Sequence, residues 1–444
     1  MTTNPRYKKI AYAITILACL PFVLSGSCRD KGVEPIQIPV KENIHLSLVD
    51  ASTTEVTLHI QADSMQYPWM LFLKRTGDRW GWHSDWIYSP SIDTVVTVDD
   101  NDPAHDYYFR AYSYTGLDWI DSSAWIKVTT MDTTSHNFTW QRFTVGGIGS
   151  SFYDVAIIND TCIIAVGEIY VQDSSGAFPT LYNVARWNGT HWSLSMVGST
   201  KLQSIFVFSE NDIWVGSSSP YHWDGTSWHG YQFSNPLFNG YLTKMWGTDS
   251  SNIYIVGTNG SIAWYNGSLW QKIESGTTFD LKDIWGAKNP KTGETEIITV
   301  GIQPGISGQC TIWHIASSTV TAISDSGIFY PFTSVWFVPE LKYYVSGVYI
   351  FAKRNLADNN RWSSDNGSFA SSEYKPSIRG NGLNDIVVAC DAGEVIHFNG
   401  YSWRNYLTET SLASGTYSRI DIRGNTVAAV GFNNNCGAII IGKR

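Results

Sequence analysis

Charged residues are scarce in this sequence: they make up 16% of its 444 residues, and the net charge is −9. No basic stripe is present, which argues against a nucleic-acid partner. The sequence also lacks CxxC pairs, Cys/His metal spacing, and the Gly-x-Ser-x-Gly, His-Glu-x-x-His and phosphate-loop motifs. We therefore expect no catalytic residue, no cofactor and no metal, which favours a binding protein over an enzyme.

Helical periodicity is missing outside the N-terminus. Aromatic residues reach 14%, with 20 Trp, and 38 Gly punctuate short apolar stretches. Aromatic strands broken by glycine turns are typical of all-β proteins. Because the chain is too long for one ordinary domain, we expect more than one all-β unit.

The N-terminus has the features of an export signal. Three basic residues precede an apolar stretch over 10–24, and three small residues then stand before Cys28. This order is typical of a secretory signal, here residues 1–27. The small residues and Cys28 resemble the lipobox of bacterial lipoproteins, although Ser25 stands where that motif usually has Leu. The resemblance implies a lipid on Cys28 and a place in the bacterial cell envelope, at the outer membrane or cell surface. An uncleaved anchor and ordinary cleavage near Ser27 are the alternatives.

Loss of residues 1–27 would remove three positive charges and no acid, which lowers the net charge from −9 to −12. Such a chain has no polybasic segment to hold a membrane, so the lipid on Cys28 would be the anchor. Residues 28–41 contain two prolines and are expected to form a tether.

Residues 42–131 contain short alternating strands whose number and spacing suit a small β-sandwich. The stretch from Tyr107 to Tyr112 resembles the F strand of a fibronectin type III domain. That resemblance implies that Tyr107 is the tyrosine-corner residue, whose hydroxyl bonds to the backbone upstream. The Trp that this family usually carries on its second strand is not evident near His59 and Ile60.

The phrase Asn/Asp-Gly-x-x-Trp recurs in the remaining part of the chain, starting at Asn188, Asp224, Asn266 and Asn399. Asn-Gly and Asp-Gly favour the positive φ angles of a type I′ hairpin turn. A second phrase, an apolar strand followed by a strand that ends at Gly, occurs in seven copies. Its first apolar residues are Val155, Ile205, Met245, Ile284, Val335, Ile378 and Ile420. The mean step is about 44 residues, which is the period of four-stranded propeller blades.

Residues 138–444 therefore resemble a seven-bladed β-propeller. The last copy lacks a Trp strand, whereas an extra strand containing Trp140 precedes the first copy at residues 138–144. We expect this N-terminal strand to complete the last blade, because a closed ring leaves no free sheet edge. An ordinary linker strand is the alternative. The WD40, kelch and sialidase Asp-box signatures are absent.

Several polar residues are best explained by the repeat itself. His222, His314 and His397 occupy similar places in three copies, so they are spread around the ring and do not converge on a metal. Asp212 and Asp385 stand between strands in Asn-Asp-Ile phrases, where Asx side chains cap turns.

The four cysteines after Cys28 lie in different copies and are expected to be free and buried. A disulfide between the first and last blades is the alternative. These cysteines are Cys162, Cys310, Cys390 and Cys436.

Aromatic residues gather in connections that the repeat does not explain. In a four-stranded blade, the loops between strands two and three lie on the same face as the connections between blades, and insertions there often carry binding. Exposed aromatics suit a glycan or a protein surface, and the alternative is that they fold back over the blade edges. The ligand-binding candidates are Tyr170, Phe178, Tyr182, Phe233, Phe238, Tyr241, Phe329 and Tyr330.

The sequence thus predicts a monomeric, lipid-anchored binding protein of the cell envelope, with a sandwich that lifts a propeller off the membrane. The propeller would contact a glycan or a protein. One alternative is a polysaccharide lyase or glycosidase, which would need carboxylates, or a Tyr or His with Arg, at the channel mouth. Another is an assembly factor for an envelope complex.

Overall fold

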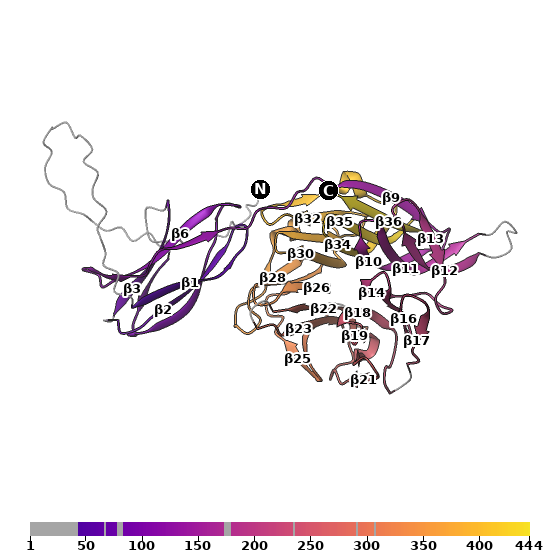
Figure 1. Ribbon diagram of the computed structural model, residues 1–444, viewed down its shortest axis with the longest axis horizontal. Helices are drawn as coiled ribbons and strands as arrows, with labels where there is room; N and C mark the ends of the chain where they lie inside the picture. The colour runs from indigo at the N-terminus through magenta and orange to yellow at the C-terminus, as the bar shows by residue number, and fades with distance from the viewer. Residues whose placement is uncertain are drawn as a thin grey trace, which may run out of the picture.

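A computed structural model describes residues 43–65, 68–77, 83–172, 179–233, 236–289, 292–305 and 308–444. The expected signal, tether and Cys28 lie outside these residues, as does Phe178. Figure 1 shows two β-rich domains, a small one in indigo and purple and a ring of sheets that runs from magenta to yellow. The prediction of an all-β chain is confirmed. Within the described residues, no helix combines the length and apolar character needed to cross a membrane.

The small domain packs two antiparallel sheets face to face. One sheet has the order β1-β2-β5, and the other has the order β4-β3-β6-β7, with β8 also paired to β6. Their bounds are β1 (Ile44–Ala51), β2 (Val56–Ala62), β3 (Trp69–Arg75), β4 (His83–Ile87), β5 (Ile92–Val98), β6 (Asp106–Tyr114), β7 (Trp119–Ser122) and β8 (Ile126–Thr129). The short strands β4 and β7 were not predicted from the sequence.

The alternation of apolar residues along these strands builds the core of the small domain. Leu58 on β2 and Leu71 on β3 are almost fully buried in one cluster with Phe109 on β6. Tyr107 is 7% exposed, and its hydroxyl accepts a hydrogen bond from the backbone N–H of Asp102 at 2.8 Å. The upstream backbone bond expected of Tyr107 is therefore present.

The large domain consists of four-stranded antiparallel sheets, seven in the part of the chain that the structure describes. The first three are β10 (Ser151–Asn159), β11 (Cys162–Val171), β12 (Thr180–Trp187) and β13 (Trp192–Ser195); β14 (Ser204–Ser209), β15 (Asp212–Gly216), β16 (Pro220–Trp223) and β17 (Trp228–Gly230); and β18 (Leu242–Asp249), β19 (Asn252–Gly257), β20 (Ile262–Tyr265) and β21 (Trp270–Ile273). The fourth and fifth are β22 (Asp280–Lys288), β23 (Thr295–Ile302), β24 (Cys310–Ala316) and β25 (Thr319–Ile323); and β26 (Phe332–Val338), β27 (Lys342–Gly347), β28 (Ile350–Lys353) and β29 (Ser363–Ser364). The last two are β30 (Ser377–Gly382), β31 (Asp385–Ala389), β32 (Val395–Phe398) and β33 (Trp403–Asn405); and β34 (Gly415–Arg423), β35 (Thr426–Asn433), β36 (Cys436–Lys443) and β9 (Thr139–Val145).

Contacts between the first strands run in a cycle, from β10 through β14, β18, β22, β26 and β30 to β34 and back to β10. The strand β9 comes before this series in the chain but pairs with β36 in the last sheet. Trp140 on β9 lies opposite Gly442, and its ring occupies the space that a Cβ on Gly442 would need, with ring atoms 2.5 Å from that position. The first and last parts of the domain are thereby joined in one sheet.

The Asn/Asp-Gly-x-x-Trp phrase forms a hairpin that differs from the predicted type I′ turn. Trp187 pairs directly with Trp192, so the loop has four residues. Gly189 has a φ of +93°, whereas Asn188 is absent from the residues with positive φ. Instead, the Asn188 carboxamide oxygen accepts backbone N–H bonds from Thr190 and His191 at 3.0 and 2.9 Å. The side chain therefore holds the turn, and only Gly needs the left-handed conformation.

Candidate functional site

Because consecutive strands of each sheet run antiparallel, the loops that join them lie alternately on two faces of the ring. We call the face with the loops between strands two and three and the connections between sheets the upper face. The lower face carries the turns between strands one and two and between strands three and four. Every ligand-binding candidate with described coordinates lies on or next to the upper face.

Four aromatic residues of the fifth sheet and its flanking connections lie on the upper face and are here named the aromatic patch: Phe329, its chain neighbour Tyr330, and Tyr349 and Phe369. Phe329 is 78% exposed and Phe369 is 75% exposed. The ring of Tyr349 lies 4.7 Å from Tyr330 and 6.3 Å from Phe369, measured between centroids. Exposed apolar groups of this kind mark interaction surfaces when they are contiguous.

The aromatic patch includes two of the predicted residues and two that the sequence reasoning missed. Phe369 ends a short 3₁₀ helix, η2 (Asn366–Phe369), and Tyr349 lies between β27 and β28. Both stand in a copy that lacks the Asn/Asp-Gly-x-x-Trp phrase. Both residues could have been predicted from the sequence, because they stand in connections that belong to the same face as those of Phe329 and Tyr330.

The other candidates divide by exposure. Tyr241 is 66% exposed, whereas Tyr170 and Tyr182 are half-buried. Phe233 packs against Trp270 with ring centroids 5.1 Å apart. The prediction for Phe238 is wrong: this residue is 5% exposed and belongs to a core cluster with Trp214 and Leu242. Phe238 therefore covers the blade edge and is unavailable to a ligand.

His222 and His397 have the structural role expected of them, but their aspartate partners do not cap turns. The third histidine, His314, lines a cleft described below. His222 bonds through Nε2 to Asp212 at 2.9 Å, and His397 bonds to Asp385 at the same distance. His397 is fully buried. The turn-capping prediction for these two aspartates is corrected, because each side chain reaches the neighbouring strand of its own sheet.

Polar residues on the first strands link most sheets of the ring to the following sheet. In five sheets, the side chain just before the first apolar residue of the repeat accepts a hydrogen bond from the backbone N–H of the corresponding apolar residue in the following sheet. These bonds are Asp154 with Ile205 (2.9 Å), Ser204 with Met245 (3.1 Å), Asp283 with Val335 (3.1 Å), Ser334 with Ile378 (3.2 Å), and Ser377 with Ile420 (3.3 Å). Asp421, which follows Ile420, links the last sheet to the first by accepting a hydrogen bond from the Ile157 N–H at 2.8 Å.

Two buried ion pairs sit in the same layer. Lys244 Nζ lies 2.6 Å from both carboxylate oxygens of Asp154. Arg379 holds Asp283 with two bonds, at 2.7 and 2.9 Å. Burial opposes ionisation of Asp283, but the Arg379 guanidinium outweighs it, and the pKa of this carboxyl falls to about 2. Asp154 and Asp283 are therefore paired with cations. Burial raises the pKa of a third carboxyl, Asp421, which lines a cavity of about 270 Å³ together with Lys244 and Arg379.

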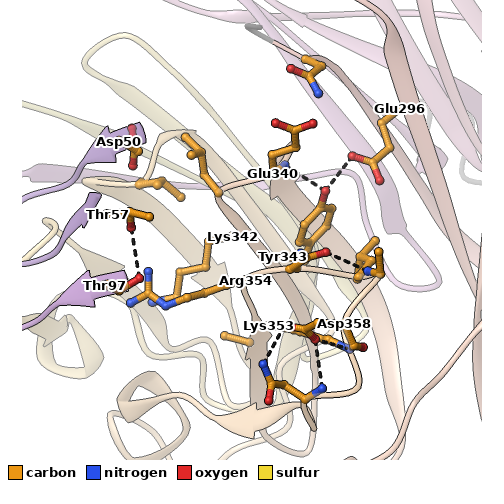
Figure 2. Close-up of a pocket in the computed structure, with 18 of the residues that line it drawn as sticks. Asp50, Thr57, Thr97, Glu296, Glu340, Lys342, Tyr343, Lys353, Arg354 and Asp358 are labelled. Carbon is orange, nitrogen blue, oxygen red and sulfur yellow. Dashed lines mark hydrogen bonds and ion pairs between the residues drawn. The ribbon is translucent and has the colours of Figure 1, made fainter. Parts of the chain in front are cut away.

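A larger cleft lies between the two domains (Figure 2). Its volume is about 1520 Å³, and its walls are the outer face of β1-β2-β5 and the lower-face turns of the fourth and fifth sheets. Arg354 forms an ion pair with Glu55 of the small domain and lies 3.7 Å from Asp99. On the opposite side, the Tyr343 hydroxyl donates to Glu296 at 2.8 Å and accepts the Glu340 N–H at 2.9 Å.

Sequence reasoning did not foresee this cleft, because its walls come from segments far apart in the chain. Among the residues that the structure describes, no group of three or more His, Cys, Asp or Glu side chains is arranged to hold a metal. The four cysteines with described coordinates are free, and three of them are buried.

Comparison with known structures identifies the fold of the ring. YCF48 bound to D1 peptide superposes with a TM-score of 0.53 at 14% identity, over 70% of this chain and 97% of that one. The larger domain is a β-propeller. YCF48 from Cyanidioschyzon merolae gives a TM-score of 0.51 at 13% identity, over 68% of this chain and 98% of that chain.

The WD40 β-propeller domain of Doa1 gives a TM-score of 0.50 at 15% identity, over 69% of this chain and 97% of that chain. No protein-family model matches the chain, and neither does any curated protein. At these identities the likeness establishes the fold alone. The β-propeller predicted from the repeat is confirmed at that level.

Proposed function

We propose that this protein is a lipid-anchored binding protein of the bacterial cell envelope, and that the upper face of its propeller binds a protein partner. The finer architecture in this proposal is a fibronectin type III-like domain followed by a seven-bladed propeller that β9 closes. The order of the small domain's two sheets and the Tyr107 corner support the first part. The cycle of first-strand contacts and the β9–β36 pairing support the second.

The aromatic patch is the observation that carries the proposal. Phenylalanine and tyrosine supply large contact areas with few rotatable bonds, and they are enriched in protein interfaces. Because Phe329 and Phe369 are mostly exposed, neither side chain is part of the propeller core. A partner that buries both rings would gain roughly 1.5–3 kcal/mol from each.

A structural neighbour supports a protein partner over a glycan. YCF48 has been solved with a bound D1 peptide, which shows that a propeller of this general shape can present a peptide-binding surface. Two of the three acids near the axis support binding rather than catalysis, because Asp154 and Asp283 are each paired with a buried cation. A carboxylate held in this way is a poor general base.

The test is affinity capture from an envelope extract with three forms of the full chain. We expect the wild type and Leu269→Ala to retain the same partner, and Phe329→Ala/Phe369→Ala to lose it. Leu269 is a matched control, because it is 69% exposed but lies in a lower-face hairpin. An unchanged set of captured proteins for the double variant would contradict the proposal.

The anchoring part of the proposal has a separate test. Cys28→Ser removes the sulfur that would carry the lipid, and a chain without lipid or polybasic segment has little affinity for a bilayer. We expect this variant to move from the membrane fraction to the soluble fraction. Retention of the full-length variant in membranes would show that residues 1–27 form an uncleaved anchor.

A further inference from the structure

The small domain meets the propeller at one end. The turn between β1 and β2 carries Thr53, whose hydroxyl donates to the Gly400 carbonyl of the sixth sheet, and Glu55, which pairs with Arg354 of the fifth. Ile44 begins β1 at the other end of the strand, so the preceding chain enters the domain there. We call this the distal end, which points away from the propeller in Figure 1.

Exposed apolar side chains gather at the distal end. The strand β3 starts there, and β4 and β6 end there, because Trp69 pairs with Ile87 and Met70 pairs with Tyr114. Four residues at or just beyond the strand ends are here named the distal patch. They are Trp86 (43% exposed), Tyr88 (76%), Leu117 (87%) and Trp119 (37%).

The members of the distal patch lie next to one another. A Cβ on Gly116 would be 3.5 Å from Cη2 of Trp86, so the Trp86 ring reaches the turn that presents Leu117. The Trp119 ring packs on Tyr114, with centroids 5.0 Å apart. The fourth member follows Trp86 by two residues, directly beyond the end of β4. Contiguous exposed apolar groups of this kind mark an interaction surface.

The composition of the distal patch matches the interfacial layer of a lipid bilayer. Tryptophan and tyrosine combine an apolar body with one polar group, and they are enriched at the level of the lipid headgroups. Leu117 protrudes from its turn and could reach the start of the acyl chains, as the apolar residues of interfacial segments do. The patch therefore has both kinds of side chain that such a contact needs.

The charges near the distal patch favour an uncharged lipid surface. Asp63 and Asp118 stand exposed in turns of the distal end. Lys74 and Arg110, on the same sheet as the patch, pair across β3 and β6 nearer the propeller end. Because acids beside the patch are repelled by anionic headgroups, we expect binding to uncharged lipid without dependence on salt.

The position of the tether supports a membrane as the occupant. Residues 28–42 separate Cys28, the proposed lipid site, from Asn43, and an extended chain of this length would span about 50 Å. An anchor at Cys28 thus keeps the distal end close to the bilayer without forcing contact. At the high local concentration that a tether provides, a patch of low affinity is sufficient to bind.

We propose that the distal patch inserts into the headgroup layer of the membrane to which the chain is anchored. The small domain then stands on the bilayer by its distal end and holds the propeller away from it. This inference rests on the anchoring part of the proposed function and goes beyond it, because it assigns a second membrane contact and an orientation. A protein partner at the aromatic patch is not required.

The experiment measures depth in the membrane with the full chain anchored in phosphatidylcholine vesicles that contain nitroxide-labelled lipid. The fluorescent amino acid Anap replaces Leu117, or Leu48 as the matched control. Leu48 is an exposed leucine on β1, in the other sheet of the same domain. Emission from position 117 should shift to the blue and be quenched about twofold or more, because interfacial apolar groups are buried about 5–10 Å deep. Emission from position 48 should show neither change.

A substitution tests the same contact from a neighbouring position. With Anap at position 88, Leu117→Asp should abolish the quenching, because a carboxylate resists transfer into lipid. Leu48→Asp is its control and should leave the quenching unchanged. Since Leu117 is so exposed, the variant should keep the wild-type melting temperature. Quenching at position 88 should also be equal in about 0.05 M and about 0.5 M salt.

Three results would overturn the proposal. These are an unquenched probe at position 117, equal quenching at positions 48 and 117, and quenching at position 88 that survives Leu117→Asp. A probe at position 117 that is blue-shifted but unquenched would show that protein covers the patch, either residues before Asn43 or another chain.

Flotation of the vesicles separates this proposal from the anchor. A chain that floats but stays unquenched refutes the membrane contact alone, whereas a chain that does not float refutes both the anchor and the contact. An uncleaved anchor over residues 1–27 leaves the test unchanged, because it too ends before Asn43.

Discussion

Replacing Arg379 by Met should destabilise the propeller far more than replacing a surface arginine. Arg379 is 4% exposed and Asp283 is 1% exposed, and the substitution leaves the buried carboxylate without its cation. Breaking a buried ion pair on one side costs about 3–5 kcal/mol. Arg404→Met is the matched control, because its exposed pair with Glu409 is worth only about 0–1 kcal/mol.

The pH dependence gives this prediction a distinctive sign. In the wild type, the folded pKa of Asp283 is about 2 and its ordinary value is 3.8. Because the folded value is lower, the pair stabilises the fold above the ordinary pKa, and this contribution is lost as the pH falls through 2. The loss amounts to roughly 2 kcal/mol. In Arg379→Met, burial alone acts on the carboxyl and raises its pKa, so the deficit relative to wild type should shrink on acidification.

Denaturant unfolding at neutral and mildly acidic pH measures both effects. The double variant Asp283→Asn/Arg379→Met removes both charges but keeps an acceptor for the Val335 N–H, and it should recover at least half of the lost free energy of unfolding. The reasoning is refuted if Arg379→Met costs no more than the Arg404 control, or if its deficit grows as the pH falls.

Three further predictions concern other parts of the ring. Trp140→Ala should lower the free energy of unfolding by about 2–3 kcal/mol, below the range for a fully buried Trp because this ring is half-exposed; a thermal melt with no shift would contradict the role of β9. Ser334→Ala should cost about 1–3 kcal/mol by leaving the Ile378 N–H unpaired, and hydrogen exchange at Ile378 should accelerate. His136→Asn should reduce the loss of thermal stability between neutral pH and about pH 5, since burial and His397 lower the pKa of His136 to about 4.

The sign of the His136 prediction follows from that lowered pKa. Nδ1 of His136 lies 2.8 Å from Nδ1 of His397, and burial lowers the pKa of both rings, which favours their neutral forms in the folded state. A base whose folded pKa is depressed stabilises the fold above its ordinary pKa of 6.5 and loses that contribution as the pH falls through 4. An unchanged acid profile in the variant would show that other groups dominate.

Much of the propeller could be predicted because its repeat is a local pattern. The Gly of each hairpin phrase lies in the turn, and the Trp three residues later begins the following strand. The pairing of β9 with the last sheet could be predicted from the sequence. The last copy of the repeat lacks a Trp strand, and an extra strand that contains Trp140 precedes the first copy. The short strands β4 and β7 were not predicted because their sequences show no clear alternation of apolar and polar residues.

The hydrogen bonds between neighbouring sheets could have been predicted from the sequence, but they were not. The residue before each first-strand apolar position is polar in every copy, from Asp154 and Ser204 to Arg419. A polar residue repeated at the ring axis is unexpected in a core and indicates a shared hydrogen-bonding role. The cleft, by contrast, could not be predicted, because Thr97 and Glu296 are brought together only by the packing of two domains.

Photo-crosslinking from the aromatic patch tests the central claim most directly. A benzoylphenylalanine at position 369 would replace an exposed ring on the upper face, and one at position 269 would report on the lower face. The account predicts that, in intact cells, position 369 gives a discrete crosslink to a protein and position 269 does not. Crosslinking from position 269 alone, or from neither position, would contradict a protein-binding surface at the patch.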